Sequence, residues 1–239
     1  MSASREAELV VAKDPTELAE LAAELAARAI HEAVTTRGVA RVALSGGSTP
    51  SATYRRLAAL ALPWDRVEWF WVDERAVPPD HARSNFRAAR LDLGDAARAG
   101  HVHRMEAERS DRDVAAADYA AALRKSFGVA EAVAFDVLTL GIGDDGHTAS
   151  LFPGTGAVAV DDRLVASVAA QPDKDLEARL SLTSPVLQRA HLVLVLASGA
   201  AKRAVVAKAR AAGPEDEVPA RLVQRCRGRA VWVVDEAAS

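Results

Sequence analysis

A chain of 239 residues, half of them apolar, is long enough for one large α/β domain with a substantial core. The formal net charge is −3, so the bulk charge gives no reason to expect a nucleic-acid or membrane surface. One cysteine excludes an internal disulfide and fits a reducing compartment.

The N-terminal residues carry charges from Arg5 onwards and never form the apolar core of a signal peptide. No apolar run approaches the roughly 18 residues that a membrane span requires. We therefore expect a cytoplasmic protein that binds neither membrane nor nucleic acid, as a monomer or a small homo-oligomer.

Strand and helix patterns alternate along the chain. Clusters of β-branched and other apolar residues predict strands at residues 8–12, 39–44, 67–72, 102–105, 135–140, 164–168, 178–182, 192–197 and 230–234. Helical spacing with caps and breakers predicts helices that start at residue 15 and run to about residue 36, and at residues 50–60, 84–91, 111–127, 184–190 and 200–211. This alternation is typical of an α/β domain, here spanning residues 1–239, with a mainly parallel sheet covered on both faces.

Polar clusters follow several of these strands. Ligands of open parallel sheets bind beyond the carboxyl ends of the strands. We therefore expect four clusters to meet at one edge of the sheet, namely residues 45–50, 73–75, 141–147 and 198–199.

The first cluster reads Ser45-Gly46-Gly47-Ser48-Thr49-Pro50. Its backbone N–H groups can turn inward around an anion, and the helix that follows presents its positive end. The same residues also suit a plain tight turn with a helix cap, so both interpretations stay open.

Residues 141–146 match G-x-G-x-x-G, which raises the alternative of a dinucleotide site. That fingerprint needs a helix at this point and an acidic residue about 20 positions later. Here Pro153-Gly154 interrupts the chain early, and the next strand leads into Ala169-Ala170-Gln171 without an acid. We expect no dinucleotide and no other cofactor.

His147 follows this glycine turn, with Asp144 and Asp145 just before it. An imidazole at a polar edge can take a proton from water, and a carboxylate can fix its tautomer. Either aspartate is suitable, and the alternative is a plain surface histidine. His101 and His103 share one face of a short strand, but no cysteine or acid stands at ligand spacing, so we expect no metal.

Three basic residues are candidates for binding an anion. Arg75 in Asp73-Glu74-Arg75 suits a phosphate or a polarised carbonyl, although a capping and salt-bridge cluster explains it equally well. Lys202 lies just inside the helix after Ser198-Gly199, and Arg179 opens an apolar strand. Taken alone, each of these two residues could bind an anion or could be an ordinary solvated or structural side chain.

Together these clusters resemble the 6-phosphogluconolactonase family. The resemblance rests, in chain order, on LSGGSTP at 44–50, WVDER-x-VP at 71–78, SN at 84–85, GIGDDGHTASLFPG at 141–154, RLSLT at 179–183 and SGAAKRAVV at 198–206. GIGDDGHTASLFPG is highly specific, whereas SGGSTP is shared with the wider sugar-phosphate isomerase and deaminase superfamily.

The resemblance implies hydrolysis of 6-phosphoglucono-1,5-lactone to 6-phosphogluconate, in the oxidative pentose phosphate pathway. It implies a modified Rossmann-like α/β/α sandwich without a required cofactor, and His147 as the base, with Asp145 beside it. The residues implied to line the sugar and phosphate site are Ser45, Gly46, Gly47, Ser48, Thr49, Asp73, Arg75, Arg179 and Lys202. Ser181 and Ala178 depart from the family's usual threonine and proline, which puts the aim of Arg179 in doubt.

Two related functions compete with this one. Glucosamine-6-phosphate deaminase/isomerase shares the fold and the Asp-Gly-His turn, but that family has a glutamate five residues after the histidine, where this chain has Phe152. Sugar-phosphate sensing domains of transcription regulators carry an added helix-turn-helix segment. This chain reaches a predicted strand by residue 8, which leaves no room for one.

Overall fold

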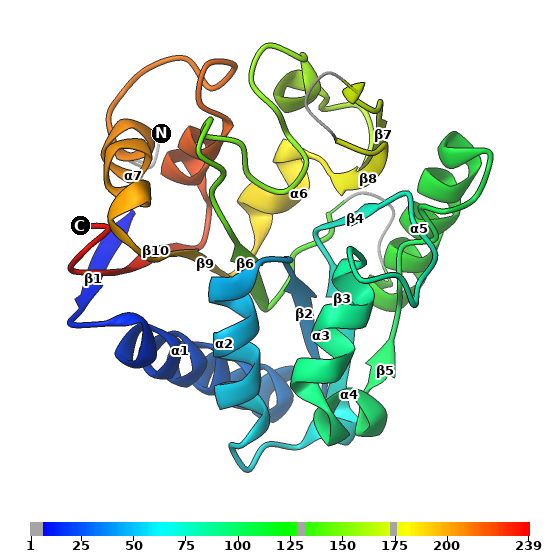
Figure 1. Ribbon diagram of the computed structural model, residues 1–239. Coiled ribbons are helices and arrows are strands. Elements are labelled where there is room, and N and C mark those ends of the chain that lie inside the picture. The colour runs from blue at the N-terminus through cyan, green and yellow to red at the C-terminus, as the bar shows by residue number, and fades with distance from the viewer. Residues whose placement is uncertain (1–6, 129–131, 173–175) are drawn as a thin grey trace.

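The computed structural model describes residues 7–128, 132–172 and 176–239. A seven-stranded sheet forms its centre, with helices on both faces (Figure 1). All of its neighbouring strands pair in parallel. The spatial order is β1 (Glu8–Ala12), β10 (Arg229–Asp235), β9 (Leu192–Ala197), β6 (Val137–Leu140), β2 (Ala40–Leu44), β3 (Val67–Trp71) and β5 (His101–Val102). The predicted mainly parallel α/β architecture is confirmed.

A second, antiparallel sheet of three strands lies beside the first. It consists of β4 (Asp73–Arg75), β8 (Arg179–Leu182) and β7 (Val165–Val168). The chain leaves the large sheet at Val72, whose N–H donates to Leu44 O at 2.9 Å and whose carbonyl accepts from Leu182 N at 2.7 Å. The strands predicted at 164–168 and 178–182 therefore exist, but they belong to this small sheet, which no sequence pattern indicated.

Helices were predicted well where they are long. The α-helices are α1 (Pro15–Arg37), α2 (Ser48–Ala58), α3 (Asn85–Leu93), α4 (Asp95–Ala99), α5 (Arg112–Phe127), α6 (Ser184–Arg189) and α7 (Arg203–Arg210). The 3₁₀ turns are η1 (Trp64–Arg66), η2 (Ala157–Ala159), η4 (Ala200–Lys202) and η5 (Pro219–Arg225). Sequence analysis missed α4, η1, η2 and η5, and it merged η4 with α7. Within the described ranges, every helix is too short or too polar to cross a membrane.

Local signals explain why α1 was found almost to the residue. The Asp14 carboxylate accepts hydrogen bonds from the N–H groups of Thr16 and Glu17, each at 2.9 Å, and Pro15 opens the first turn. Gly38 ends the helix with φ at 79°, in the left-handed region that glycine adopts at little cost. By contrast α4 has five residues, which is too short for a helical pattern to emerge.

The strands of the large sheet form the core on which the loops rest. Every residue of β6 and β9 is buried, which agrees with the predicted sheet covered on both faces. The side chains of Trp69, Phe70 and Trp71 in β3 are at most 1% exposed. Dense packing of this kind gives the loops at the strand ends fixed starting points.

Burial also determines the chemistry of Cys226. Its thiol is 8% exposed, and burial, aided by the charge of Glu215, raises its pKa to about 12 from 9.0. The thiolate is the reactive form, so alkylation of the folded protein at pH 8 should be about 10³-fold slower than that of an exposed thiol. Mass spectrometry of iodoacetamide-treated protein, native and in urea, measures this ratio. Rapid labelling of the native chain would contradict it.

Candidate active site

The four polar clusters meet in one cavity of about 230 Å³ at the carboxyl ends of β2, β6 and β9. Its lining includes Ser45, Gly46, Gly47, Ser48, Thr49, Asp73, Arg75, Asn85, Gly141, Gly143, His147, Arg179, Ser198 and Lys202. Of the sequence-predicted site residues, only Asp145 lies outside the lining, and it contacts His147 from behind.

Buried polar side chains fix the start of the glycine loop. The N–H of Ser45 donates to Tyr54 Oη at 2.9 Å and to Thr139 Oγ1 at 3.0 Å, and the Tyr54 hydroxyl donates to Ser45 O at 2.8 Å. Burial raises the pKa of Tyr54 to about 12, so it stays a neutral donor. Gly47 then provides the N-cap of α2 without a side-chain hydrogen bond, with φ at 114°. The first N–H groups of α2 are thus available to an anion.

Asn85 packs directly against this loop. A Cβ at Gly46 would overlap the Asn85 amide, so only glycine fits there. The Asn85 Nδ2 group donates to Asp73 O at 2.9 Å and to Asp73 Oδ1 at 3.2 Å. Asn85 therefore connects the glycine loop to β4, a contact that sequence analysis did not predict.

Two guanidinium groups lie side by side in the small sheet. Arg75 of β4 pairs in register with Arg179 of β8. The Nε atoms of both are buried without a hydrogen-bond partner among the described residues. Arg179 is 7% exposed, and burial lowers its pKa, assisted by Arg75 and opposed by Asp73 and Glu177. Buried donors without partners favour an anionic ligand at this position.

The carboxylate of Asp73 holds these groups in place. Its Oδ2 accepts from Ser150 Oγ at 2.6 Å and lies 3.5 Å from Arg179 Nη1. The neighbouring Glu74 turns the opposite way, and its carboxylate accepts the N–H groups of Asn85 and Phe86 at 2.8 Å each. Burial raises the pKa of Glu74, and these hydrogen bonds oppose the shift. Asp73 therefore faces the cavity, whereas Glu74 caps α3.

His147 is held from behind by Asp145. The imidazole Nδ1 lies 2.6 Å from Asp145 Oδ1, which also accepts the His147 backbone N–H at 3.0 Å. The hydrogen bond from His147 lowers the pKa of Asp145 to about 2, so this carboxylate is ionised at neutral pH and acts as an acceptor. The proton therefore sits on Nδ1, and Nε2 keeps its lone pair free to act as a base. Of the two candidate aspartates, Asp145 is the one that contacts the imidazole.

Asp144 serves another contact. Its carboxylate accepts from Lys202 Nζ at 2.6 Å, and the same ammonium donates to Ile142 O at 2.9 Å. The Asp144 side chain is 82% exposed, so this ion pair is screened by water and breaks at little cost. Lys202 thus lies at the cavity wall with a partner that an anionic ligand can replace.

Phe152 is a site residue that sequence analysis used only to argue against the deaminase. Its ring centroid lies 4.6 Å from that of His147, and the Arg179 guanidinium carbon lies 5.5 Å from the same centroid. Phe152 is 2% exposed, so its ring is a buried apolar neighbour of both the imidazole and the guanidinium. The signal that could have identified Phe152 from the sequence is its position in the SLFPG segment, which is part of the motif that carries the family resemblance.

Of the two histidines that were considered as a possible metal pair, His103 packs against an aromatic ring. His103 stacks on Phe70, with ring centroids 4.5 Å apart, and burial lowers its pKa. Across the described ranges, no group of three or more histidine, cysteine, aspartate or glutamate side chains is arranged to hold a metal ion.

Comparison with known proteins gives a consistent result. A family model described as glucosamine-6-phosphate isomerases/6-phosphogluconolactonase matches residues 13–232. A 6-phosphogluconolactonase of Synechocystis sp. is 41% identical over 216 residues, covering 87% of each chain. The human 6-phosphogluconolactonase is 37% identical over 236 residues, covering 93% of this chain and 87% of the relative. The chain belongs to the glucosamine-6-phosphate isomerase/6-phosphogluconolactonase family.

Solved structures agree with this assignment. The 6-phosphogluconolactonase from Trypanosoma cruzi has a TM-score of 0.87 at 28% identity, covering 98% of this chain and 96% of that chain. A monomeric glucosamine-6-phosphate deaminase has a TM-score of 0.80 at 21% identity, covering 97% and 98% respectively, a likeness of fold alone. The fold is therefore shared by two chemistries, and the side chains of the cavity must distinguish them.

The contacts of the two aspartates predict different kinetic effects. Asp145→Asn removes the acceptor that holds the His147 tautomer, and kcat should fall by about 10²–10⁴-fold. Asp144→Asn is the matched variant one residue away, and it should alter KM through Lys202 while kcat changes less than about threefold. Steady-state kinetics of both variants tests this. If the two variants lost kcat equally, contact with the imidazole would not explain the effect of Asp145→Asn.

Proposed function

We propose that this protein hydrolyses 6-phospho-D-glucono-1,5-lactone to 6-phospho-D-gluconate, with His147 as general base. The observation that carries the proposal is the His147–Asp145 pair, with Nδ1 2.6 Å from the carboxylate, in the same cavity as the glycine loop and the two guanidinium groups. Relatives named 6-phosphogluconolactonase, 41% and 37% identical, support the substrate.

The cavity offers a binding element for each end of this substrate. The N–H groups of the glycine loop, the positive end of α2 and the cations Arg179 and Lys202 suit the dianionic phosphate. His147 then faces the lactone carbonyl carbon, and Arg75 or a backbone N–H donates to the carbonyl oxygen. Anchoring the phosphate converts its binding energy into orientation of the ring.

The reaction needs one water molecule and one base. Nε2 of His147 takes a proton from water as the water oxygen bonds to the lactone carbonyl carbon. The resulting oxyanion is stabilised by the donor beside it. When the bond between that carbon and the ring oxygen breaks, the imidazolium returns its proton to the departing ring oxygen. The products are a hydroxyl group and a carboxylic acid, which loses its proton to water.

This set of groups is sufficient for a reactive ester. A general base contributes on the order of 10²–10⁴-fold. A donor to the oxyanion adds roughly 10²–10³-fold. A δ-lactone is already strained toward opening, so the reaction needs no covalent nucleophile.

Phe152 argues against the deaminase alternative. In that family a glutamate five residues after the histidine takes part in proton transfer, as the sequence resemblance implies. In this chain the position is apolar, 2% exposed and in ring contact with His147. A buried phenyl ring cannot carry a proton, so we assign lactone hydrolysis and not amine release.

The cellular setting and size of the working unit are part of the proposal. We propose one functional domain over residues 1–239, working in the cytoplasm as a monomer or a small homo-oligomer. The lone cysteine of the sequence supports this setting, because it fits a reducing compartment.

A coupled assay tests the function directly. Glucose-6-phosphate dehydrogenase generates the lactone, and its decay is followed with and without the protein. We expect rapid decay with wild type, and for His147→Ala a kcat lower by about 10²–10⁴-fold with a modest change in KM. Near-wild-type turnover of His147→Ala would remove His147 as the base, and unaccelerated decay with wild type would refute the lactonase assignment.

The phosphate end has its own test. Lys202→Ala should raise KM for the phosphorylated lactone by about tenfold, the loss of one charge-assisted hydrogen bond, while kcat changes little. The corresponding lactone without phosphate, glucono-1,5-lactone, serves as control because its KM should not respond. If KM for the phosphorylated substrate stayed unchanged, Lys202 would act only on the 142–144 turn.

A further inference from the structure

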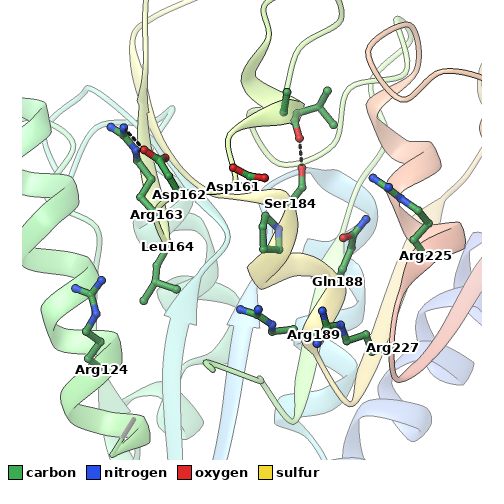
Figure 2. A pocket seen from close by; sticks show the side chains of 13 residues that line it. Arg124, Asp161, Asp162, Arg163, Leu164, Ser184, Gln188, Arg189, Arg225 and Arg227 are labelled. Carbon is green, nitrogen blue, oxygen red and sulfur yellow. Dashed lines mark hydrogen bonds and ion pairs between the residues drawn. The ribbon is translucent and has the colours of Figure 1, made fainter. Parts of the chain in front are cut away.

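A second cavity, of about 640 Å³, shares no lining residue with the proposed active site. Its walls come from segments far apart in the chain: η2 and its connection to β7, helix α6, the end of η5 and its connection to β10, and one residue of α5 (Figure 2). This volume lies within the range of about 300–1,000 Å³ that is typical of small-molecule sites.

Arginines dominate the polar lining of this cavity. They come from four segments and are Arg124, Arg163, Arg189, Arg225 and Arg227. The acidic lining residues are Asp161 and Asp162, so positive charge is in excess. The whole chain has a formal net charge of −3, so this concentration of guanidinium groups is a local feature of the cavity.

The arginines differ in how they are paired. Arg163 donates through Nε and Nη2 to the two oxygens of Asp162, each at 2.8 Å, but both side chains are more than half exposed, so water weakens the pair. Arg225 pairs with Glu215. The Arg227 side chain makes no hydrogen bond or ion pair with any residue in the described ranges. Arg163 and Arg227 are therefore the donors that a ligand can engage.

The backbone fixes the position of Arg227. Its N–H donates to Gln188 O at 2.8 Å, which places residue 227 at the end of α6. Figure 2 shows Arg189 and Arg227 in the lower part of the view and Asp161 above them. The Arg227 charge has no acidic partner in the described ranges, so an anion in the cavity would supply one.

Hydrogen bonds hold the cavity open. Ser184 Oγ donates to Val158 O at 2.7 Å, and Gln188 Nε2 donates to Leu222 O at 3.2 Å, so these polar groups serve the walls. Leu164 and Pro185 add an apolar surface beside the guanidinium groups. A ligand with an anionic head and a carbon skeleton matches this combination.

We propose that this cavity is a second anion-binding site, which takes a small phosphate-bearing metabolite. The phosphate lies at Arg227, away from Asp161, because a phosphate close to that carboxylate would be repelled. Arginine is suited to this because its planar fork donates two parallel hydrogen bonds to phosphate oxygens. The site is independent of the lactonase chemistry, since the two cavities share no residue.

Amide NMR of the full-length, ¹⁵N-labelled protein titrated with inorganic pyrophosphate tests the proposal at constant ionic strength. The amides of residues 161–164, 186–189 and 227 should shift along a saturable curve. The amides of residues 45–49 report separately on the proposed active site, so the titration can reject anion binding at one site without rejecting it at the other. Absence of shifts at the second cavity, or equal shifts with sodium chloride alone, would overturn the proposal.

Variants make the test specific. Arg227→Ala should weaken binding of pyrophosphate at the second cavity by about tenfold, and Arg163→Ala should weaken it to a smaller extent because its pair with Asp162 must break. Arg66→Ala is the matched control, since Arg66 is exposed, pairs with Asp65 and does not line the cavity. Unchanged affinity in Arg227→Ala would overturn the assignment of the phosphate position.

The source of the phosphate is decided by two further titrations. Adenosine diphosphate and glucose 6-phosphate share the phosphate chemistry but differ in the carbon skeleton that would contact Leu164 and Pro185. Tighter binding of one of them than of pyrophosphate identifies the class of metabolite. Weaker binding of both would refute the proposed role of the apolar wall.

Discussion

The antiparallel pairing of β4 with β8 places Arg75 opposite Arg179, and both guanidinium groups retain a buried Nε without a hydrogen-bond partner among the described residues. Leaving such donors unpaired costs free energy, and an anion in the cavity would supply the missing acceptor. Asp73 compensates part of this charge and is itself held by Ser150 and Asn85. The small sheet therefore places positively charged side chains beside the carboxyl ends of the strands of the large sheet.

The rest of the cavity is arranged around that charge. The glycine loop stands against Asn85 so closely that Gly46 cannot carry a side chain, and this contact connects the loop to Asp73. On the other side, a Cβ at Gly143 would overlap the His147 ring, so the turn that carries the histidine also depends on a missing side chain. Close approach of backbone to side chains, allowed by glycine, brings His147 and the glycine loop into one small cavity.

The same fold in a glucosamine-6-phosphate deaminase, with a TM-score of 0.80 at 21% identity, shows that the architecture does not select the reaction. Phe152 marks the position at which this chain differs from the deaminase pattern implied by the sequence resemblance. Its ring contacts both the His147 imidazole and the Arg179 guanidinium, and a phenyl ring cannot carry a proton. The proposed lactone hydrolysis needs no proton carrier at this position, because that proposal assigns proton transfer to His147.

The sequence by itself determined the elements with strong local signals and predicted which residues meet in the cavity. Asp14, Pro15 and Gly38 fixed α1 because caps and breakers act within a turn of the chain, and the largely apolar sequences of β6 and β9 predicted burial on both faces. Four polar clusters after strands predicted one shared cavity, because parallel strands end at a common edge.

Only the tertiary structure decided contacts between distant residues. That β7 and β8 join β4 in a separate sheet depends on Val72 bonding to both Leu44 and Leu182, which no local pattern encodes. That Asp145 holds the imidazole while Asp144 reaches Lys202 depends on how the 141–147 turn folds back on itself. The second, arginine-lined cavity likewise exists only where separate segments of the chain converge. The type of each side chain is given by the sequence at that position, whereas which side chains meet depends on how the whole chain packs.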